Sequence, residues 1–188
     1  MNKFFYVYSI ILIGLSGCGG TMNVNNFNNS LPTLVLEDYF DGETKAWGMV
    51  HDRFGNLKRQ FSVDIVGQWD GTTLTLNEDF VYADGELDRR VWNIRKVSEG
   101  QYVGVADDII GEAKGTAKGN ALNWQYEMNL NISGRDWKVK FDDWLFLQEN
   151  GVLLNRASIK KFGIELAVVT LSFSQKIDAL SRKTVAAE

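Results

Sequence analysis

In one stretch of the second half of the chain, apolar and polar residues alternate without a break. Between positions 122 and 132 every second residue is apolar and the residues between are polar, the apolar set being Leu122, Trp124, Tyr126, Met128, Leu130 and Ile132. Because successive side chains of a β-strand point to opposite faces, this pattern predicts a long strand with one apolar face and one face in water.

Pairs of residues typical of tight turns recur along the chain after residue 34. They are Gly55-Asn56, Asp70-Gly71, Asp84-Gly85, Glu99-Gly100, Gly119-Asn120, Ser133-Gly134, Asn150-Gly151 and Phe162-Gly163. These eight turns bound nine strands, and their spacing of mostly 14 to 17 residues makes the strands long. Such a meander closes most readily into a barrel, because closure removes exposed strand edges. We therefore predict an all-β fold, an up-and-down antiparallel β-barrel of about 8 to 10 strands.

The alternation by itself leaves open which face is inside, since a barrel that spans a membrane is apolar outside and polar within. The chain ends on Thr184-Val185-Ala186-Ala187-Glu188 and not on a final apolar strand. We therefore favour a barrel surrounded by water, with its apolar side chains inside.

Turn lengths predict which residues face each other in the first hairpins. A two-residue loop at Asp70-Gly71 sets Ile65 opposite Leu76, Val63 opposite Glu78 and Phe61 opposite Phe80. A three-residue loop at Ala83-Asp84-Gly85 pairs Leu74 with Ile94, Leu76 with Trp92 and Glu78 with Arg90. A carboxylate and a guanidinium then face each other on the core side. They either fix the register as an ion pair, or are turned outward by a bulge, or, with Trp92, anchor the polar part of a ligand.

A second polar group follows from the later hairpins. A loop at Gly134-Arg135 pairs Met128 with Phe141 and Tyr126 with Asp143, and a loop at Asn150-Gly151 sets Leu147 opposite Leu154, Leu145 opposite Arg156, Asp143 opposite Ser158 and Phe141 opposite Lys160. Asp143 is the lone acid on an apolar face. We predict Tyr126, Asp143, Arg156 and Ser158 as further ligand-binding residues, the alternative being an internal polar network with no ligand.

The first residues have the layout of a removable secretory signal. Lys3 precedes an apolar run from Phe4 to Leu15, and Leu15-Ser16-Gly17-Cys18 resembles the bacterial lipobox, whose cysteine receives a lipid. We expect a signal peptide over 1–17, a lipidated Cys18 with a flexible asparagine-rich tether over 18–33, a barrel domain over 34–175 and a polar tail over 176–188. The alternative is an ordinary signal with a chance cysteine. The residue after the lipobox cysteine is Gly19 and not the aspartate that resemblance to inner-membrane lipoproteins would require, which favours the outer membrane.

The amino-acid composition argues against several classes of function. The net charge is −4 with no block of Lys or Arg, which argues against a nucleic-acid partner. Cys18 is the only cysteine and His51 the only histidine, so a lipidated Cys18 leaves no thiol, and a hydrolytic triad would need His51 as its base. Neither a phosphate-binding nor a dinucleotide-binding glycine motif is present. We expect no metal and no cofactor.

Several strings together resemble a bacterial lipoprotein family, domain of unknown function 3833, from about Leu34 to Phe173. They are Ala46-Trp47-Gly48, Trp69-Asp70-Gly71, Phe80-Val81-Tyr82-Ala83-Asp84-Gly85-Glu86, Gly119-Asn120-Ala121-Leu122, Phe141-Asp142-Asp143-Trp144 and Asn155-Arg156-Ala157-Ser158. In addition, Gly67-Gln68-Trp69 is similar to the Gly-x-Trp of lipocalins. The family resemblance implies no particular activity. It implies gene neighbours such as cyclopropane-fatty-acid-synthase-like enzymes, which favours a lipid-linked envelope role.

These observations lead to one main functional hypothesis and two alternatives. We expect a lipoprotein anchored to the periplasmic face of the bacterial outer membrane, whose lipocalin-like barrel binds a small amphipathic or fatty ligand. The first alternative is an enzyme that modifies a lipid acyl chain, with Glu78, Asp143 or Tyr126 in acid–base roles. The second is a filled, non-catalytic barrel that binds an envelope protein.

Overall fold

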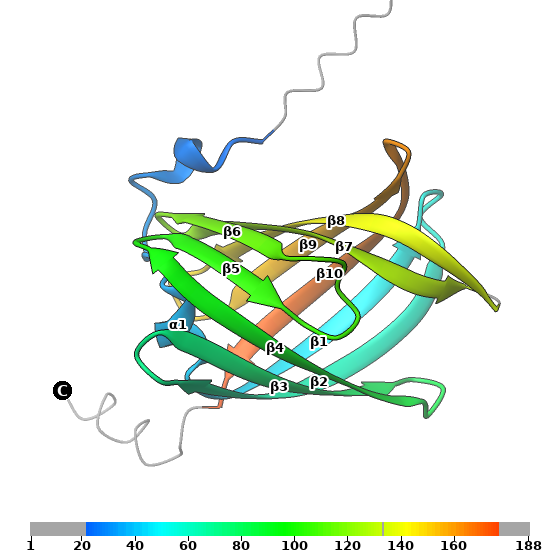
Figure 1. The fold of residues 1–188 in the computed structure, drawn as a ribbon, viewed down its shortest axis with the longest axis horizontal. Coiled ribbons are helices and arrows are strands. Elements are labelled where there is room, and N and C mark those ends of the chain that lie inside the picture. Colours follow the sequence, from blue (N-terminus) through cyan, green and yellow to red (C-terminus); the bar gives the residue numbers. More distant parts are fainter. Residues whose placement is uncertain (1–21, 133, 177–188) are drawn as a thin grey trace, which may run out of the picture.

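A computed structural model describes residues 22–132 and 134–176 and shows a closed barrel of ten antiparallel strands (Figure 1). Each strand pairs with its neighbours in sequence, and β1 pairs with β10 to close the barrel. The predicted all-β, up-and-down barrel is therefore confirmed. The strands are β1 (Gly42–Asp52), β2 (Leu57–Trp69), β3 (Thr73–Tyr82), β4 (Leu87–Ser98), β5 (Gln101–Val105), β6 (Ala113–Lys118), β7 (Ala121–Ile132), β8 (Arg135–Leu147), β9 (Leu153–Lys161) and β10 (Ile164–Gln175).

The extra strand arises where the sequence showed no turn. The region expected to be one strand is divided by residues 106–112 into the short strands β5 and β6. The connecting segment lies along β7, where Ile109 forms an isolated bridge with Met128 and the amide of Ile110 donates to the carbonyl of Glu127 at 2.7 Å. It thus extends the wall where β5 and β6 are too short to do so.

The predicted register holds in one hairpin and is displaced by two residues in two others. In β3–β4, Glu78 faces Arg90 as expected. In β2–β3, Ile65 faces Glu78, because the Asp70 carboxylate accepts hydrogen bonds from the amides of Thr72 and Thr73 and the loop is longer than two residues. In β7–β8, Tyr126 faces Phe141 and Trp124 faces Asp143. A displacement of two residues leaves every side chain on its predicted face.

The predicted β8–β9 register is wrong by one residue, which has a larger effect. Leu147 pairs with Leu153, so Arg156 faces Trp144 and Ser158 faces Asp142. A slip by one residue moves every side chain of a strand to the other face. Arg156 and Ser158 therefore lie on the outer face of the barrel, and not beside Asp143 as the sequence had predicted.

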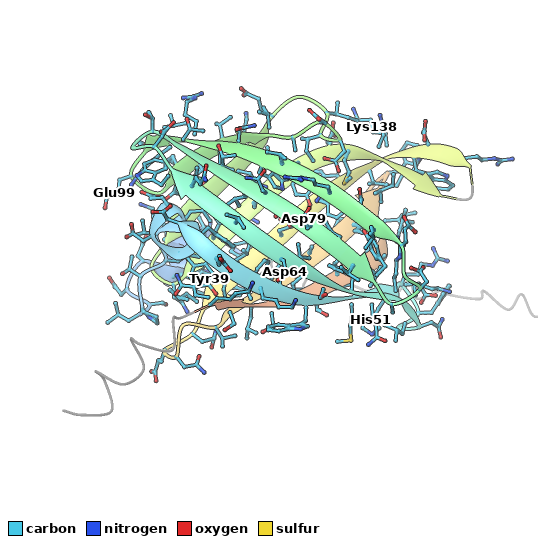
Figure 2. The ribbon with its side chains drawn as sticks, turned by 90° about the horizontal axis from the view of Figure 1, so that it is seen from below. Tyr39, His51, Asp64, Asp79, Glu99 and Lys138 are labelled. Carbon is cyan, nitrogen blue, oxygen red and sulfur yellow. The ribbon has the colours of Figure 1, made fainter. Side chains whose placement is uncertain are left out.

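One end of the barrel is closed by the short helix α1 (Leu36–Phe40), which lies inside the left-hand end in Figure 1. Its apolar side chains are buried, and the hydroxyl of Tyr39 donates to the carbonyls of Gly151 and Phe173. Figure 2 shows Tyr39 at this end, far from His51. A Cβ on Gly67 would lie 1.7 Å from the carbonyl oxygen of Phe40, so only glycine allows the helix to approach β2 this closely.

The segment before α1 also contacts the barrel. It contains a single 3-10 turn, η1 (Val24–Phe27), and the ring of Phe27 packs against Trp144 and Phe146 on the outer face of β8, with centroids 6.1 and 5.3 Å away. The predicted signal peptide, the lipidated Cys18 and most of the polar tail lie outside the described residues. Within the described part of the chain, no helix has both the length and the apolar character needed to cross a membrane.

Candidate functional site

The barrel encloses a cavity of about 330 Å³. Its floor is formed by Leu36 and Phe40 of α1, and most of its wall is apolar. Polar side chains are few, namely Arg59, Glu78, Tyr82, Arg90, Tyr126, Asp143 and Asn155.

The cavity is open at the end opposite α1. Inward-facing residues near the helix, such as Val63 and Ile65, are fully buried. On the same strand and on its neighbour β3, Phe61, Phe80 and Tyr82 also line the cavity but are only partly buried. This gradient of exposure places the mouth at the end that carries the turns β1–β2, β3–β4, β7–β8 and β9–β10, on the right in Figure 1.

Four aromatic rings form a continuous group along one side of the cavity. The ring of Trp92 meets those of Trp124 and Tyr126 edge-on at 5.6 and 5.5 Å, and Tyr126 stacks on Phe141 at 4.8 Å. Such contacts fix the rings relative to one another. They form a rigid apolar surface against which an alkyl chain or a flat ring can lie.

The guanidinium of Arg90 is already engaged by a carboxylate. Its Nε and Nη2 atoms donate to Oδ2 of Asp108 at 2.9 and 2.6 Å. Asp108 lies in the β5–β6 connection, so this ion pair ties that segment to β4. Sequence reasoning expected Arg90 to pair with Glu78 and missed Asp108, whose only signal was the acidic pair Asp107-Asp108 in a segment without periodicity.

Glu78 faces Arg90 across the strands but forms no hydrogen bond or ion pair with any described residue. Burial raises the pKa of Glu78 to about 7. The positive charge of Arg90 opposes this rise, and the negative charge of Asp108 adds to it. Its carboxyl group is therefore divided between the neutral and the charged form near neutral pH.

The pKa of Asp143 is shifted further than that of Glu78. Its Oδ1 atom is buried and has no hydrogen-bond partner among the described residues. Burial, together with the charge of Asp142, raises the pKa of Asp143 to about 8, against the opposing effect of Arg90. Burial and the charge of Asp143 raise the pKa of the neighbouring Tyr126 hydroxyl well above its ordinary value. At neutral pH the Asp143 carboxyl is mainly protonated and can donate a hydrogen bond into the cavity.

Residues 12–175 match the family model described as "Protein of unknown function (DUF3833)". The chain belongs to the DUF3833 family. No curated protein matches the chain. Among solved structures, the chain is similar to the S-type phycobiliprotein lyase CPES from Guillardia theta, with 9% identity, a TM-score of 0.55, and coverage of 76% of this chain and 91% of that one. At this identity the likeness shows the fold alone, which is lipocalin-like.

This DUF3833 barrel brings five of the seven predicted ligand-binding residues to one cavity, namely Glu78, Arg90, Trp92, Tyr126 and Asp143. Arg156 and Ser158 do not line it. On the outer face, the Ser158 hydroxyl donates to Oε2 of Glu165 at 2.8 Å, and Arg156 lies 3.6 Å from the same carboxylate. The structure therefore joins the first predicted polar group to Tyr126 and Asp143 of the second and excludes Arg156 and Ser158. The binding role of the five stays a prediction.

The DUF3833 cavity combines an apolar wall with two acids that can donate or accept a proton near neutral pH. It can surround an apolar molecule and hydrogen-bond its polar end. In the described part of the chain, no three His, Cys, Asp or Glu side chains come together as a metal site would require. The candidate chemistry is thus that of the carboxyl groups of Glu78 and Asp143 and the hydroxyl of Tyr126.

Proposed function

We propose that this protein binds a small amphipathic or fatty molecule inside its barrel, in the service of envelope or membrane-lipid physiology. The observation that carries the proposal is the cavity, which is mostly apolar, closed by α1 and open at the opposite end. Its volume of about 330 Å³ lies at the lower end of the range for small-molecule sites. The occupant is accordingly a single slender chain or a small ring system.

The charges of the cavity indicate how such a molecule is oriented. Glu78 and Asp143 offer carboxyl groups that form no hydrogen bond or ion pair with any described residue, so the polar end of the ligand lies near them. Both cations of the wall are already engaged, Arg90 by Asp108 and Arg59 by Glu86. A ligand carboxylate would meet two acids and no free cation, which favours a neutral or positively charged polar end.

We also propose that the protein is attached to the periplasmic face of the outer membrane by a lipid on Cys18. The support is the sequence around Leu15-Ser16-Gly17-Cys18. Growth with an alkyne-tagged palmitate should label the wild-type chain and leave a Cys18→Ser variant unlabelled. Equal labelling of the two would refute the anchor.

Extraction of the purified barrel followed by lipid mass spectrometry tests ligand binding directly. Displacement of a fluorescent naphthalene-sulfonate probe by dodecanol, dodecylamine and dodecanoate then ranks the polar ends. Ala157→Leu adds side-chain volume to the cavity wall and should weaken binding, whereas Thr75→Leu, on the outer face, should not. An empty barrel that binds none of these compounds would refute the proposal and favour the alternative of an envelope protein that binds a partner.

One observation favours an enzyme as a second candidate. The pKa values of Glu78 and Asp143, raised to about 7 and about 8, suit groups that exchange protons at neutral pH. An enzyme would release a chemically altered form of the extracted ligand. Asp143→Asn and Glu78→Gln should then abolish the conversion while leaving the ligand bound, whereas a pure binding protein returns the ligand unchanged in all forms.

A further inference from the structure

Large apolar side chains are exposed around the mouth of the barrel. Phe162, Phe54 and Leu87 are 93%, 75% and 73% exposed, more than any other described large apolar residue after Gly42. Leu57 and Ile164, which are also exposed, follow Phe54 and Phe162 within three residues. They belong to the turns β1–β2, β3–β4 and β9–β10 or to the strand ends beside them. We call these five residues the apolar rim.

The three turns that carry the apolar rim are tied together. The amide of Arg53 in the β1–β2 turn donates to the carbonyl of Leu166 on β10 at 2.9 Å. The amide of Ala83 in the β3–β4 turn donates to the carbonyl of Gln60 on β2, also at 2.9 Å. The rim residues therefore lie along one continuous side of the mouth and can contact a single surface together.

Neither turn geometry nor packing explains the phenylalanine at position 162. Phe162 has φ 51° and Gly163 has φ 78°, so the two residues form a turn in which both have positive φ. Asparagine or glycine is favoured at the first of these positions, and a bulky side chain is strained there. The ring is 93% exposed and so gains little from burial. A side chain that the turn disfavours and the core does not use indicates contact with something outside the barrel.

Positive charges accompany the two exposed rings. The guanidinium of Arg53 lies 4.7 Å from the ring centre of Phe54, and Nζ of Lys161 lies 5.5 Å from that of Phe162. At a membrane, apolar rings enter the acyl region while neighbouring Arg and Lys side chains extend to the phosphate groups. The β1–β2 and β9–β10 turns of the rim thus match the layered chemistry of a phospholipid surface.

We propose that the apolar rim docks the open end of the barrel on a phospholipid bilayer. Phe54, Leu87 and Phe162 enter the outer part of the acyl region, and Arg53 and Lys161 contact lipid phosphates. In this position the mouth of the cavity faces the lipid. An apolar molecule can then pass between bilayer and barrel without crossing water, whichever molecule the cavity takes. This contact is separate from the anchor proposed at Cys18.

Vesicle co-sedimentation tests the rim without the proposed anchor. Residues 22–176 contain the complete barrel, α1 and every described core contact, so a chain of residues 19–188 is suitable. The probe is a vesicle of phosphatidylethanolamine and phosphatidylglycerol. The rim variant Phe54→Ser, Leu87→Thr, Phe162→Asn should bind at least ~10-fold more weakly than the parent chain. The control Val66→Thr, Val97→Thr, Leu154→Thr removes apolar surface that is 43–53% exposed away from the mouth and should bind as the parent does.

The single change Phe162→Asn separates docking from misfolding. It places a favoured residue in the turn and should raise Tm by a few degrees while it lowers vesicle binding. Vesicle binding that is absent in the parent chain, or equal in the rim variant and the control, would overturn the proposal. So would a parent chain that forms dimers which only the rim variant dissociates, because the rim would then cover a second copy. A barrel that takes up dodecanol but ignores vesicles overturns the rim alone and leaves the cavity proposal intact.

Discussion

Acids whose pKa burial tends to raise occur at two places in this barrel, and their surroundings differ. We call the helix α1, which closes one end of the barrel, the plug. In the plug, the carboxylate of Glu37 forms an ion pair with Lys96 and accepts a hydrogen bond from the Tyr102 hydroxyl at 2.8 Å. In the cavity, Asp143 has a buried oxygen without a partner in the described chain, and Glu78 has no bonded partner there. Burial alone raises the pKa of Glu37, but the hydrogen bonds from Lys96, from the backbone and from Tyr102 outweigh it, and the pKa is lowered. The pKa values of the cavity acids are raised.

This contrast distinguishes an acid that stabilises the fold from two acids that belong to the candidate site. The plug acid stabilises the fold through its partners, because a paired and hydrogen-bonded carboxylate offsets the cost of its burial. The cavity acids reduce stability when charged, because the attraction of Arg90 does not offset the cost of their burial. Residues that weaken a fold while lining its cavity are typical of functional sites.

The largest effect is expected in the plug. Lys96→Met keeps the apolar stem and leaves the Glu37 carboxylate buried without its cation, which should lower the free energy of unfolding by about 3 kcal/mol. Lys45→Met is a matched control. Lys45 and Lys96 are equally exposed, at 32% and 33%, but their partners Asp64 and Glu37 are 45% and 7% exposed. Urea unfolding at pH 7 should show a loss below about 1 kcal/mol for the control.

The contribution of the Glu37–Lys96 ion pair to the free energy of unfolding depends on pH. Because folding lowers the pKa of Glu37, its contribution is fully present above the ordinary carboxyl pKa and is lost as the pH falls from there through the lowered pKa of the folded state. The difference between wild type and Lys96→Met should therefore shrink in acid. Equal losses for Lys96→Met and Lys45→Met at pH 7 would show that Glu37 is no more dependent on its partner than a surface acid.

The cavity acid should behave in the opposite way. Folded Asp143 keeps its proton up to about pH 8, whereas the unfolded chain loses it near the ordinary value. Stability from this group thus falls as the pH rises between those limits. Asp143→Asn removes the penalty and should be more stable than wild type at pH 9, with a much smaller difference at pH 5.

The control for this measurement is Asp107→Asn, which changes an exposed acid outside the cavity wall. Its stability relative to wild type should not change between pH 5 and pH 9. A pH-independent effect of Asp143→Asn would mean that the Asp143 carboxyl is charged throughout, and the contrast with the plug would fail.

The sequence predicts the fold well because turn chemistry is local. At Ala83-Asp84-Gly85, Gly85 has φ 87° and the amide of Tyr82 donates to the carbonyl of Glu86, as a three-residue loop requires. The similar pair Asp70-Gly71 misled the prediction, because the Asp70 side chain also accepts hydrogen bonds from the amides of Thr72 and Thr73. Side-chain capping of this kind depends on the residues after the turn, which a dipeptide pattern ignores.

The site could be predicted only in part, and for a different reason. Glu78 and Asp143 were identified because a charged residue stands out on an apolar face. Ser158 was misplaced because Leu153 and Leu154 fit either face, so the apolar pattern could not choose between registers one residue apart. Asp108 lies in a connection without periodicity, and only the folded chain shows that it reaches Arg90.

The smallest expected change in stability concerns this last contact. Asp108→Asn removes the carboxylate from Arg90, and since the two side chains are 22% and 37% exposed, the loss should be about 1 kcal/mol. The consequence for binding is more informative, because Arg90 becomes a free cation inside the cavity. Affinity for dodecanoate should rise several-fold, while affinity for dodecanol stays the same.

The pair Asp79–Arg89 on the outer face provides the control for this change, since it joins the same residue types at 3.7 Å with both side chains more than 60% exposed. Figure 2 shows Asp79 on the wall, midway between the two ends of the barrel. Asp79→Asn should leave the binding of both compounds unchanged. If Asp108→Asn does the same, the charge of Arg90 does not reach the ligand. Selection against carboxylates would then have to come from Glu78 and Asp143 themselves, and the double variant Glu78→Gln, Asp143→Asn should be the one that accepts dodecanoate.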